Sequence, residues 1–269
     1  MKIKDYVKQI FYSFNLFLCL GFCLQIFLPL PALSATNLQN LFNTALLKSQ
    51  EGNCLSAIED WDNFLELSPD EPAAISNRGN CLLVLGDPVG AIEAHTKALT
   101  ILPQNQDAHL NRGIAEEALH QWDLAVNDYE WILERHPKDS SALYNLGNVK
   151  GSQDNWEEAE NLFNQAFLAR SGFAMAQSSK ALAQYQLGKI NEAETELRLL
   201  IRKYPMFADA RAALSALLAK QGHLGEAESH WAAANGLDVR YKDRDWLLNI
   251  RRWPSVPIDD LMYFLNLDN

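Results

Sequence analysis

Histidines are the side chains of this sequence that could hold a metal ion or move a proton. His223 and His230 lie seven residues apart and could share one face of a helix, but no further ligands can be assigned beside them. The chain contains no H-E-x-x-H, G-x-S-x-G, P-loop or G-x-G-x-x-G motif. We therefore expect no metal site, no cofactor and no catalysis.

Paired acidic residues are the other candidates for chemistry. Glu116-Glu117 and Glu157-Glu158 could act as carboxylate dyads if a concave sugar site lay between them, and nothing in the sequence suggests one. Both pairs are therefore expected to be solvated helix faces. An enzyme would also need a further domain, for which this length leaves no room.

The elements that carry these side chains repeat every 34 residues, in the register of residues 72–105. Position 8 of each repeat is always small, and position 20 is always alanine: Ala57, Ala91, Ala125, Ala159, Ala193 and Ala227. Position 24 is large in most repeats, and position 32 is proline in four of them. Small residues at positions 8 and 20 are expected where the two helices of one repeat cross closely.

This pattern resembles the tetratricopeptide repeat, a helix–turn–helix unit of 34 residues. The resemblance implies an all-α, right-handed solenoid of six repeats with a C-terminal helical cap. The repeats are expected at residues 38–71, 72–105, 106–139, 140–173, 174–207 and 208–241, and the cap at 242–269. Within the second repeat, helices are expected from about Ala73 to Leu85 and from Asp87, as N-cap, to before Pro103.

Residues 242–269 contain two apolar stripes at helical spacing, separated by Pro254. A cap over the last repeat is the simpler interpretation, because the open end of a solenoid needs one. The alternative is a docking surface built on Trp246, Arg251, Arg252 and Trp253. The segment DWLLNIRRWP at 245–254 is similar to the tail of tetratricopeptide proteins of cyanobacteria and the chloroplast lumen, which implies a thylakoid lumen or periplasm.

Residues 1–35 have the layout of a signal peptide. Three lysines among the first eight residues precede an apolar segment at 16–28, and prolines and small residues follow. This predicts export with cleavage after Ser34 or Ala35. An uncleaved membrane anchor is the alternative, although the apolar segment is short for a membrane span.

Removing residues 1–35 would make the chain more acidic than its full-length net charge of −11. So acidic a chain repels phosphate backbones, which argues against nucleic acid as a partner. Cys54 and Cys81 would remain in the exported chain. They could pair in an oxidising compartment, or they could be two small buried apolar residues.

In this repeat family the first helix of each unit lines a concave groove, chiefly through positions 2, 5, 6, 9, 12 and 13. Asparagine recurs at positions 6 and 9: Asn43, Asn77, Asn80, Asn111, Asn145 and Asn148. An asparagine amide offers both a donor and an acceptor, so a row of them can pair with an extended peptide backbone. They could equally tie adjacent helices together, and both roles can hold at once.

Apolar and aromatic residues accompany the asparagines on the predicted groove: Phe42, Leu46, Leu83, Val84, Leu110, Ile114, Tyr144, Leu182 and Tyr185. Position 5 carries no lysine or arginine, which disfavours binding of acidic chaperone tails. We predict a non-catalytic scaffold or chaperone-like assembly factor that binds protein partners, plausible clients being subunits of photosynthetic or other membrane complexes. Alternatives are a regulatory subunit of an envelope enzyme or a membrane-anchored adaptor.

Overall fold

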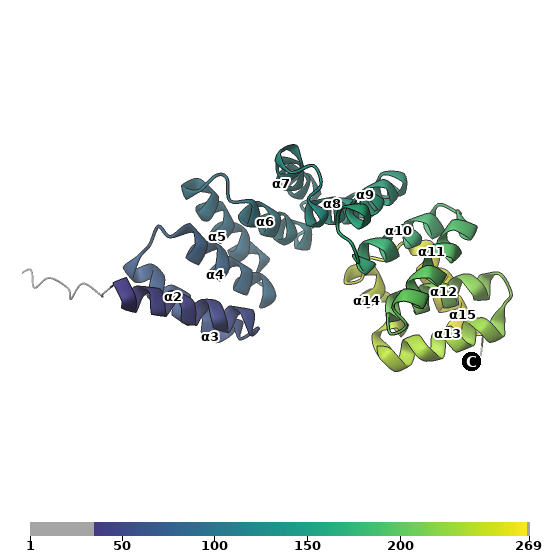
Figure 1. The fold of residues 1–269 in the computed structure, drawn as a ribbon. Coiled ribbons are helices and arrows are strands. Elements are labelled where there is room, and N and C mark those ends of the chain that lie inside the picture. The colour runs from purple at the N-terminus through teal and green to yellow at the C-terminus, as the bar shows by residue number, and fades with distance from the viewer. Residues whose placement is uncertain (1–34, 268–269) are drawn as a thin grey trace, which may run out of the picture.

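The computed structural model describes residues 35–267, and every regular element in that range is a helix. The predicted all-α solenoid is confirmed: consecutive helices pair into six helix–turn–helix units that follow one another along an arc (Figure 1). The predicted signal segment lies outside the described residues, apart from Ala35. The paired helices are α2 (Ala35–Gln50) with α3 (Cys54–Leu67), α4 (Pro72–Val84) with α5 (Pro88–Ile101), α6 (Gln106–Ala118) with α7 (Trp122–Arg135), α8 (Ser140–Ser152) with α9 (Trp156–Ala169), α10 (Ala174–Gln186) with α11 (Ile190–Lys203), and α12 (Ala208–Lys220) with α13 (Leu224–Leu237).

The second repeat shows how the sequence sets these bounds. The Asp87 carboxylate accepts a hydrogen bond from the Gly90 backbone N–H at 2.9 Å, which caps α5. Pro88 opens the helix, where its missing N–H is not needed. The helix ends at Ile101, two residues before Pro103, as predicted.

The turn between the two helices needs a left-handed residue at position 15 of every repeat. Four repeats have glycine there, at residues 52, 86, 188 and 222, with φ between 73° and 83°. In the third and fourth repeats His120 and Asp154 adopt φ of 57° and 59° instead. Histidine and aspartate tolerate this region better than most side chains, so the turn survives without glycine.

The helix crossing differs in detail from the prediction. An added Cβ at Gly113 would lie 2.7 Å from the Tyr129 ring, and one at Gly147 would lie 2.7 Å from the Phe163 ring. The small residue at position 8 therefore makes room for the large residue at position 24, rather than for the alanine at position 20. All six alanines at position 20 are completely buried.

After α13 the chain forms a 3₁₀ turn, η1 (Val239–Lys242), and two further helices, α14 (Arg244–Asn249) and α15 (Ser255–Leu265). We call residues 239–267 the tail. In Figure 1 its yellow α15 lies against α12 and α10, the first helices of the last two repeats. Ile258, Leu261 and Phe264 of α15 are buried in the same core as the alanines and leucines of α12.

The tail covers more than the open end of the solenoid, because α10 and α12 line its concave side. Trp253 is only 2% exposed, and Arg251 and Arg252 form ion pairs with groove carboxylates. Arg251, Arg252 and Trp253 are therefore engaged within the protein, which favours the cap over the alternative of a docking surface built on these residues and Trp246. None of the helices formed by residues 35–267 is both long and apolar enough to span a membrane.

Candidate peptide-binding groove

The first helices α2, α4, α6 and α8 place the predicted asparagines along one side of the solenoid. Asn43 is exposed, and Asn77, Asn80, Asn111, Asn145 and Asn148 are half-exposed. Their neighbours Leu83, Leu110, Ile114 and Tyr144 are also half-exposed, and Val84 is 69% exposed. The groove of the first four repeats is therefore open and mixes amide with apolar surface.

Three of the asparagines have free side chains. Within residues 35–267, no hydrogen bond engages the amides of Asn77, Asn111 and Asn145. Nothing in the described part of the chain supports a helix-tying role for these three. Asn80 Oδ1 is buried and lacks a hydrogen-bond partner among the described atoms. Asn43 differs, because its Oδ1 accepts from Gln39 Nε2 at 3.0 Å.

Tyr144 is fixed in place by its neighbours. Its ring centroid lies 5.6 Å from that of Phe163 and 5.1 Å from that of Phe173. Burial raises the pKa of its hydroxyl, and the neighbouring Ser179 and Asn148 side chains only partly offset this. Tyr144 is thus an aromatic edge of the groove that its ring neighbours hold in place.

Tyr185 lies under the tail and is not open to a partner in this structure. It is completely buried, and its hydroxyl donates a 3.0 Å hydrogen bond to Asp260 on α15. Burial, followed by the nearby Asp260 carboxylate, raises its pKa. Leu182, from the same helix, is only 3% exposed. The open groove therefore ends before the fifth repeat.

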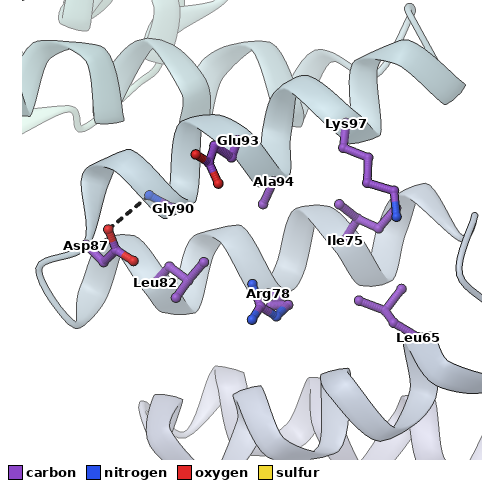
Figure 2. A pocket seen from close by; sticks show the side chains of 9 residues that line it. All are labelled: Leu65, Ile75, Arg78, Leu82, Asp87, Gly90, Glu93, Ala94 and Lys97. Carbon is purple, nitrogen blue, oxygen red and sulfur yellow. Dashed lines mark hydrogen bonds between the residues drawn. The ribbon is translucent and has the colours of Figure 1, made fainter.

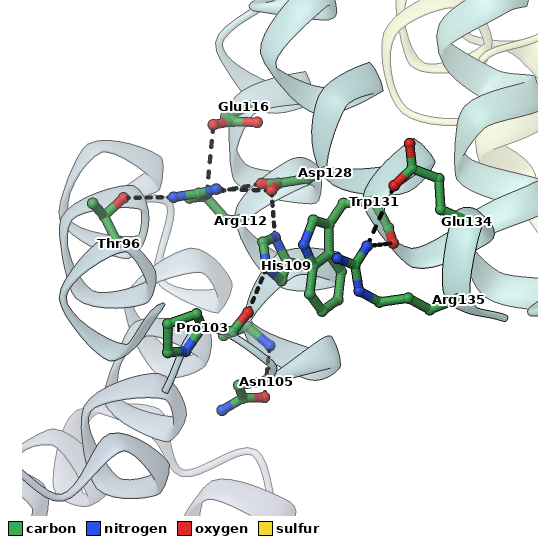
Figure 3. Close-up of polar contacts among 11 residues, drawn as sticks. Thr96, Pro103, Asn105, His109, Arg112, Glu116, Asp128, Trp131, Glu134 and Arg135 are labelled. Carbon is green, nitrogen blue, oxygen red and sulfur yellow. Dashed lines mark hydrogen bonds and ion pairs between the residues drawn. The ribbon is translucent and has the colours of Figure 1, made fainter. Parts of the chain in front are cut away.

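A buried polar network lies on the third repeat (Figure 3). Arg112 donates to both carboxylate oxygens of Asp128 at 2.8 Å, and His109 Nδ1 lies 2.7 Å from Asp128 Oδ1. Burial works to raise the pKa of Asp128, but the bonds from Arg112 and His109 outweigh it and hold the pKa below its usual value. His109 is stacked on Trp131, and its Nε2 lies 3.2 Å from the Pro103 carbonyl oxygen. Both ring nitrogens of His109 are therefore engaged by partners within the protein.

The prediction that Glu116-Glu117 is a solvated face is wrong, since the two are only 5% and 2% exposed. Burial, followed by the Asp128 charge, raises the pKa of Glu116 to about 7, and Arg112 only partly offsets this. Glu117 accepts hydrogen bonds from the Tyr129 hydroxyl and from Arg252 of the tail. Sequence reasoning missed both roles, because each depends on partners far away in the chain.

A surface cavity of about 450 Å³ lies between α4 and α5 (Figure 2). Three of its four charged side chains already have partners within the protein, and the fourth, Glu93, is exposed. Arg78 bonds Asp62 at 2.6 Å, Lys97 bonds the Pro69 carbonyl at 3.0 Å, and Asp87 caps α5. In residues 35–267 no group of three or more histidines, cysteines or acids is placed to hold a metal ion. Cys54 and Cys81 are buried free thiols.

The family comparison agrees with this architecture. A family model described as tetratricopeptide repeat matches residues 42–106, 110–172 and 146–206, which together make up more than half of the chain. The chain is a tetratricopeptide repeat protein. Proteins built from this repeat bind protein partners and are generally non-catalytic scaffolds.

Other known proteins are similar to this chain in sequence or in fold. The chain is 31% identical over 121 residues to the mitochondrial import receptor subunit TOM70 of Rattus norvegicus, covering 41% of this chain and 20% of that protein. It thus spans about a fifth of that relative's length. A tetratricopeptide repeat protein from Parabacteroides merdae superposes with a TM-score of 0.62 at 20% identity, over 84% of this chain and 98% of that one. YrrB, a tetratricopeptide protein with an unusual peptide-binding site, superposes with a TM-score of 0.52 at 17% identity, over 71% and 97%.

Proposed function

We propose that this protein is an exported, non-catalytic scaffold that holds an extended segment of a partner protein in the groove of its first four repeats. The partners are subunits of a membrane complex whose assembly the scaffold assists, in a thylakoid lumen or periplasm. The tail resemblance and the layout of residues 1–35 support this location. The names of two similar proteins, an import receptor subunit and a peptide-binding repeat protein, are in keeping with binding of polypeptide segments.

The observation that carries the proposal is the row of unpaired amides at position 6. Asn77, Asn111 and Asn145 occur once per repeat on successive groove helices, and none of them has a hydrogen bond within residues 35–267. An extended backbone presents N–H and C=O groups in regular alternation, and an asparagine amide can pair with both. The exposed Val84 and the half-exposed Leu83 and Ile114 provide apolar contacts beside these amides.

A photo-crosslinking experiment in the native compartment tests the groove. We place benzoylphenylalanine at Asn111 in the groove or, as the control, at Glu157, which is exposed on the outer helix α9. The groove position should yield one or a few discrete adducts with membrane-complex subunits, and the control should not. Adducts from Glu157 with none from Asn111 would reject the groove. Adducts with a soluble enzyme would favour a regulatory subunit instead.

The proposed export has its own test. Intact-mass measurement of the native protein should give an N-terminus between residues 33 and 37, as cleavage near Ala35 requires. A species that retains Met1 would mean a membrane-anchored protein.

A further inference from the structure

The tail packs into the groove of the last two repeats. The site that it contacts is formed by repeat positions 2 and 5, which in the first four repeats belong to the proposed binding groove. Asp209, at position 2 of the sixth repeat, is 2% exposed and accepts bonds from Arg251 Nη2 at 2.6 Å, Trp253 Nε1 at 3.0 Å and Tyr241 Oη at 3.0 Å. Ser178, at position 5, completes this set with a 2.6 Å bond to the same carboxylate. The protein thus contains its own example of a segment held in its groove.

The contact between Arg252 and Glu117 extends this arrangement to the open groove. Glu117 is at position 12 of the third repeat, 135 residues before Arg252 in the chain. Arg252 bonds Glu117 Oε2, while the Tyr129 hydroxyl bonds Oε1. To make this contact, Arg252 adopts a left-handed backbone with φ of 55°, which is unfavourable for a side chain of its kind.

The Glu117 site selects for a cation. Glu117 is almost completely buried, so losing Arg252 would leave its charge without a counter-ion. The groove positions of the first four repeats carry no lysine or arginine, and their charged residues are Asp107 and Glu117. A partner segment that reaches Glu117 therefore meets an acidic, desolvated site, where the planar guanidinium of arginine fits best.

We propose that Glu117 is an arginine-binding site at the end of the open groove, occupied by Arg252 until an arginine-bearing partner segment replaces it. The inference rests on the proposed function and adds the chemistry of the partner to it. Binding of such a segment and release of residues 249–254 are then coupled, since one carboxylate serves both. Ile250, which is 67% exposed beside this contact, lies on the segment that moves.

The test uses the full chain, a synthetic probe and two variants of the contact between Arg252 and Glu117, which we call the latch variants. Arg252→Gln and Glu117→Gln both break the contact, but only the first leaves the carboxylate free to bind a new arginine. The probe is a fluorescein-labelled peptide copying residues 249–254, and a matched peptide carries Arg251→Gln and Arg252→Gln. Arg252→Gln should bind the arginine peptide about tenfold more tightly than the unchanged chain, because the tethered competitor is removed. Glu117→Gln should not bind it.

Hydrogen exchange and a control variant complete the design. Backbone amides of residues 249–254 should exchange faster in both latch variants. Arg244→Gln, which breaks an exposed ion pair with Asp259 on the same tail, should match the unchanged chain in both assays. Equal binding of the two peptides by Arg252→Gln, or unchanged exchange in that variant, would overturn the proposal even if Glu117→Gln failed to fold. If the arginine site is overturned in this way but Asn111 still crosslinks to the partner in the Glu117→Gln variant, the proposed function would stand without the arginine site.

Discussion

Asp107 and Asp209 occupy the same position of the third and sixth repeats, and their surroundings differ completely. Asp107 is exposed in the first turn of α6, where the helix dipole stabilises a negative charge. Asp209 is buried beneath the tail and accepts hydrogen bonds from arginine, tryptophan, tyrosine and serine side chains. One repeat geometry therefore gives an open groove surface at one end of the protein and a closed, stabilised core at the other.

This difference shows that the position of a residue within the repeat does not by itself determine whether the residue contributes to binding or to stability. In the closed region the tail supplies the ligands, and the groove residues contribute to stability. In the open region three of the four amides at position 6, those of Asn77, Asn111 and Asn145, have no hydrogen bond within residues 35–267, so these positions are available to a partner. Substitutions in the groove should accordingly reduce stability in the last two repeats and partner binding in the first four.

The largest effect should come from Asp209→Ala. This change leaves Arg251 without its carboxylate in a largely buried site, so the free energy of unfolding should fall by about 3–5 kcal/mol. Urea denaturation followed by circular dichroism measures it. The matched control is Asp107→Ala, which loses only an exposed helix-dipole interaction and should cost less than about 1 kcal/mol. Equal losses for the two variants would contradict the distinction between open and closed regions.

The 34-residue register predicted the repeats and their helices, because position-specific small residues and proline stops act within a single repeat. The binding groove on the first helices stays a prediction. The register could not predict that Glu117 and Asp209 are buried. Their partners, Arg252 and Arg251, lie 135 and 42 residues away, and no periodic pattern reports on such distant pairing. The first apolar stripe of residues 242–269 predicts a helix that continues to Pro254, but α14 ends at Asn249, and both arginines turn into the groove.

Glu116 should show the next largest effect, through the pH dependence of stability. Its pKa of about 7 in the folded protein exceeds the ordinary 4.5, so raising the pH from 4.5 to 7 destabilises the fold. His95 acts in the opposite direction. Burial, followed by the Arg112 charge, lowers its pKa from 6.5 to about 4, so raising the pH from 4 to 6.5 stabilises the fold. The two contributions largely cancel in the unchanged protein.

Glu116→Gln should remove one of these two contributions. The variant should be more stable than the unchanged protein at pH 8 by about 2–4 kcal/mol, because an ionised carboxylate is no longer buried with Oε2 unpaired. Its stability should now rise between pH 4 and 6.5, since the contribution of His95 is no longer opposed by that of Glu116. Denaturant melts at several pH values measure this. A Glu116→Gln variant that is less stable at pH 8 would show that its pairing with Arg112 dominates, as pairing does for Asp209.

The open groove should respond in partner binding rather than in stability. Changing Asn77, Asn111 and Asn145 together to alanine removes amides that have no bond within residues 35–267, so the melting temperature should stay nearly constant. Capture of the partner identified by crosslinking should weaken by about tenfold or more, given roughly 0.5–1.5 kcal/mol for each lost hydrogen bond. Glu157→Gln with Glu158→Gln on the outer face is the control. Loss of capture in the control but not in the triple variant would move the binding site to the outer surface.

The smallest effect should come from Tyr185→Phe, which removes one hydroxyl at the border between the two regions. The lost bond to Asp260 should cost about 0.5–1.5 kcal/mol, and the low end is expected because Lys220 still bonds the same carboxylate oxygen at 2.7 Å. Hydrogen exchange should rise in α15 but not in α4 or α6, since the bond joins the tail to the closed region only. Tyr144→Phe is the matched control: its hydroxyl makes no hydrogen bond to α15 within residues 35–267, so α15 should keep its protection. Among the paired helices, α15 packs against α10 and α12, the first helices of the last two repeats. Exchange that rose equally in α4 would therefore mean that the closed region supports the open one.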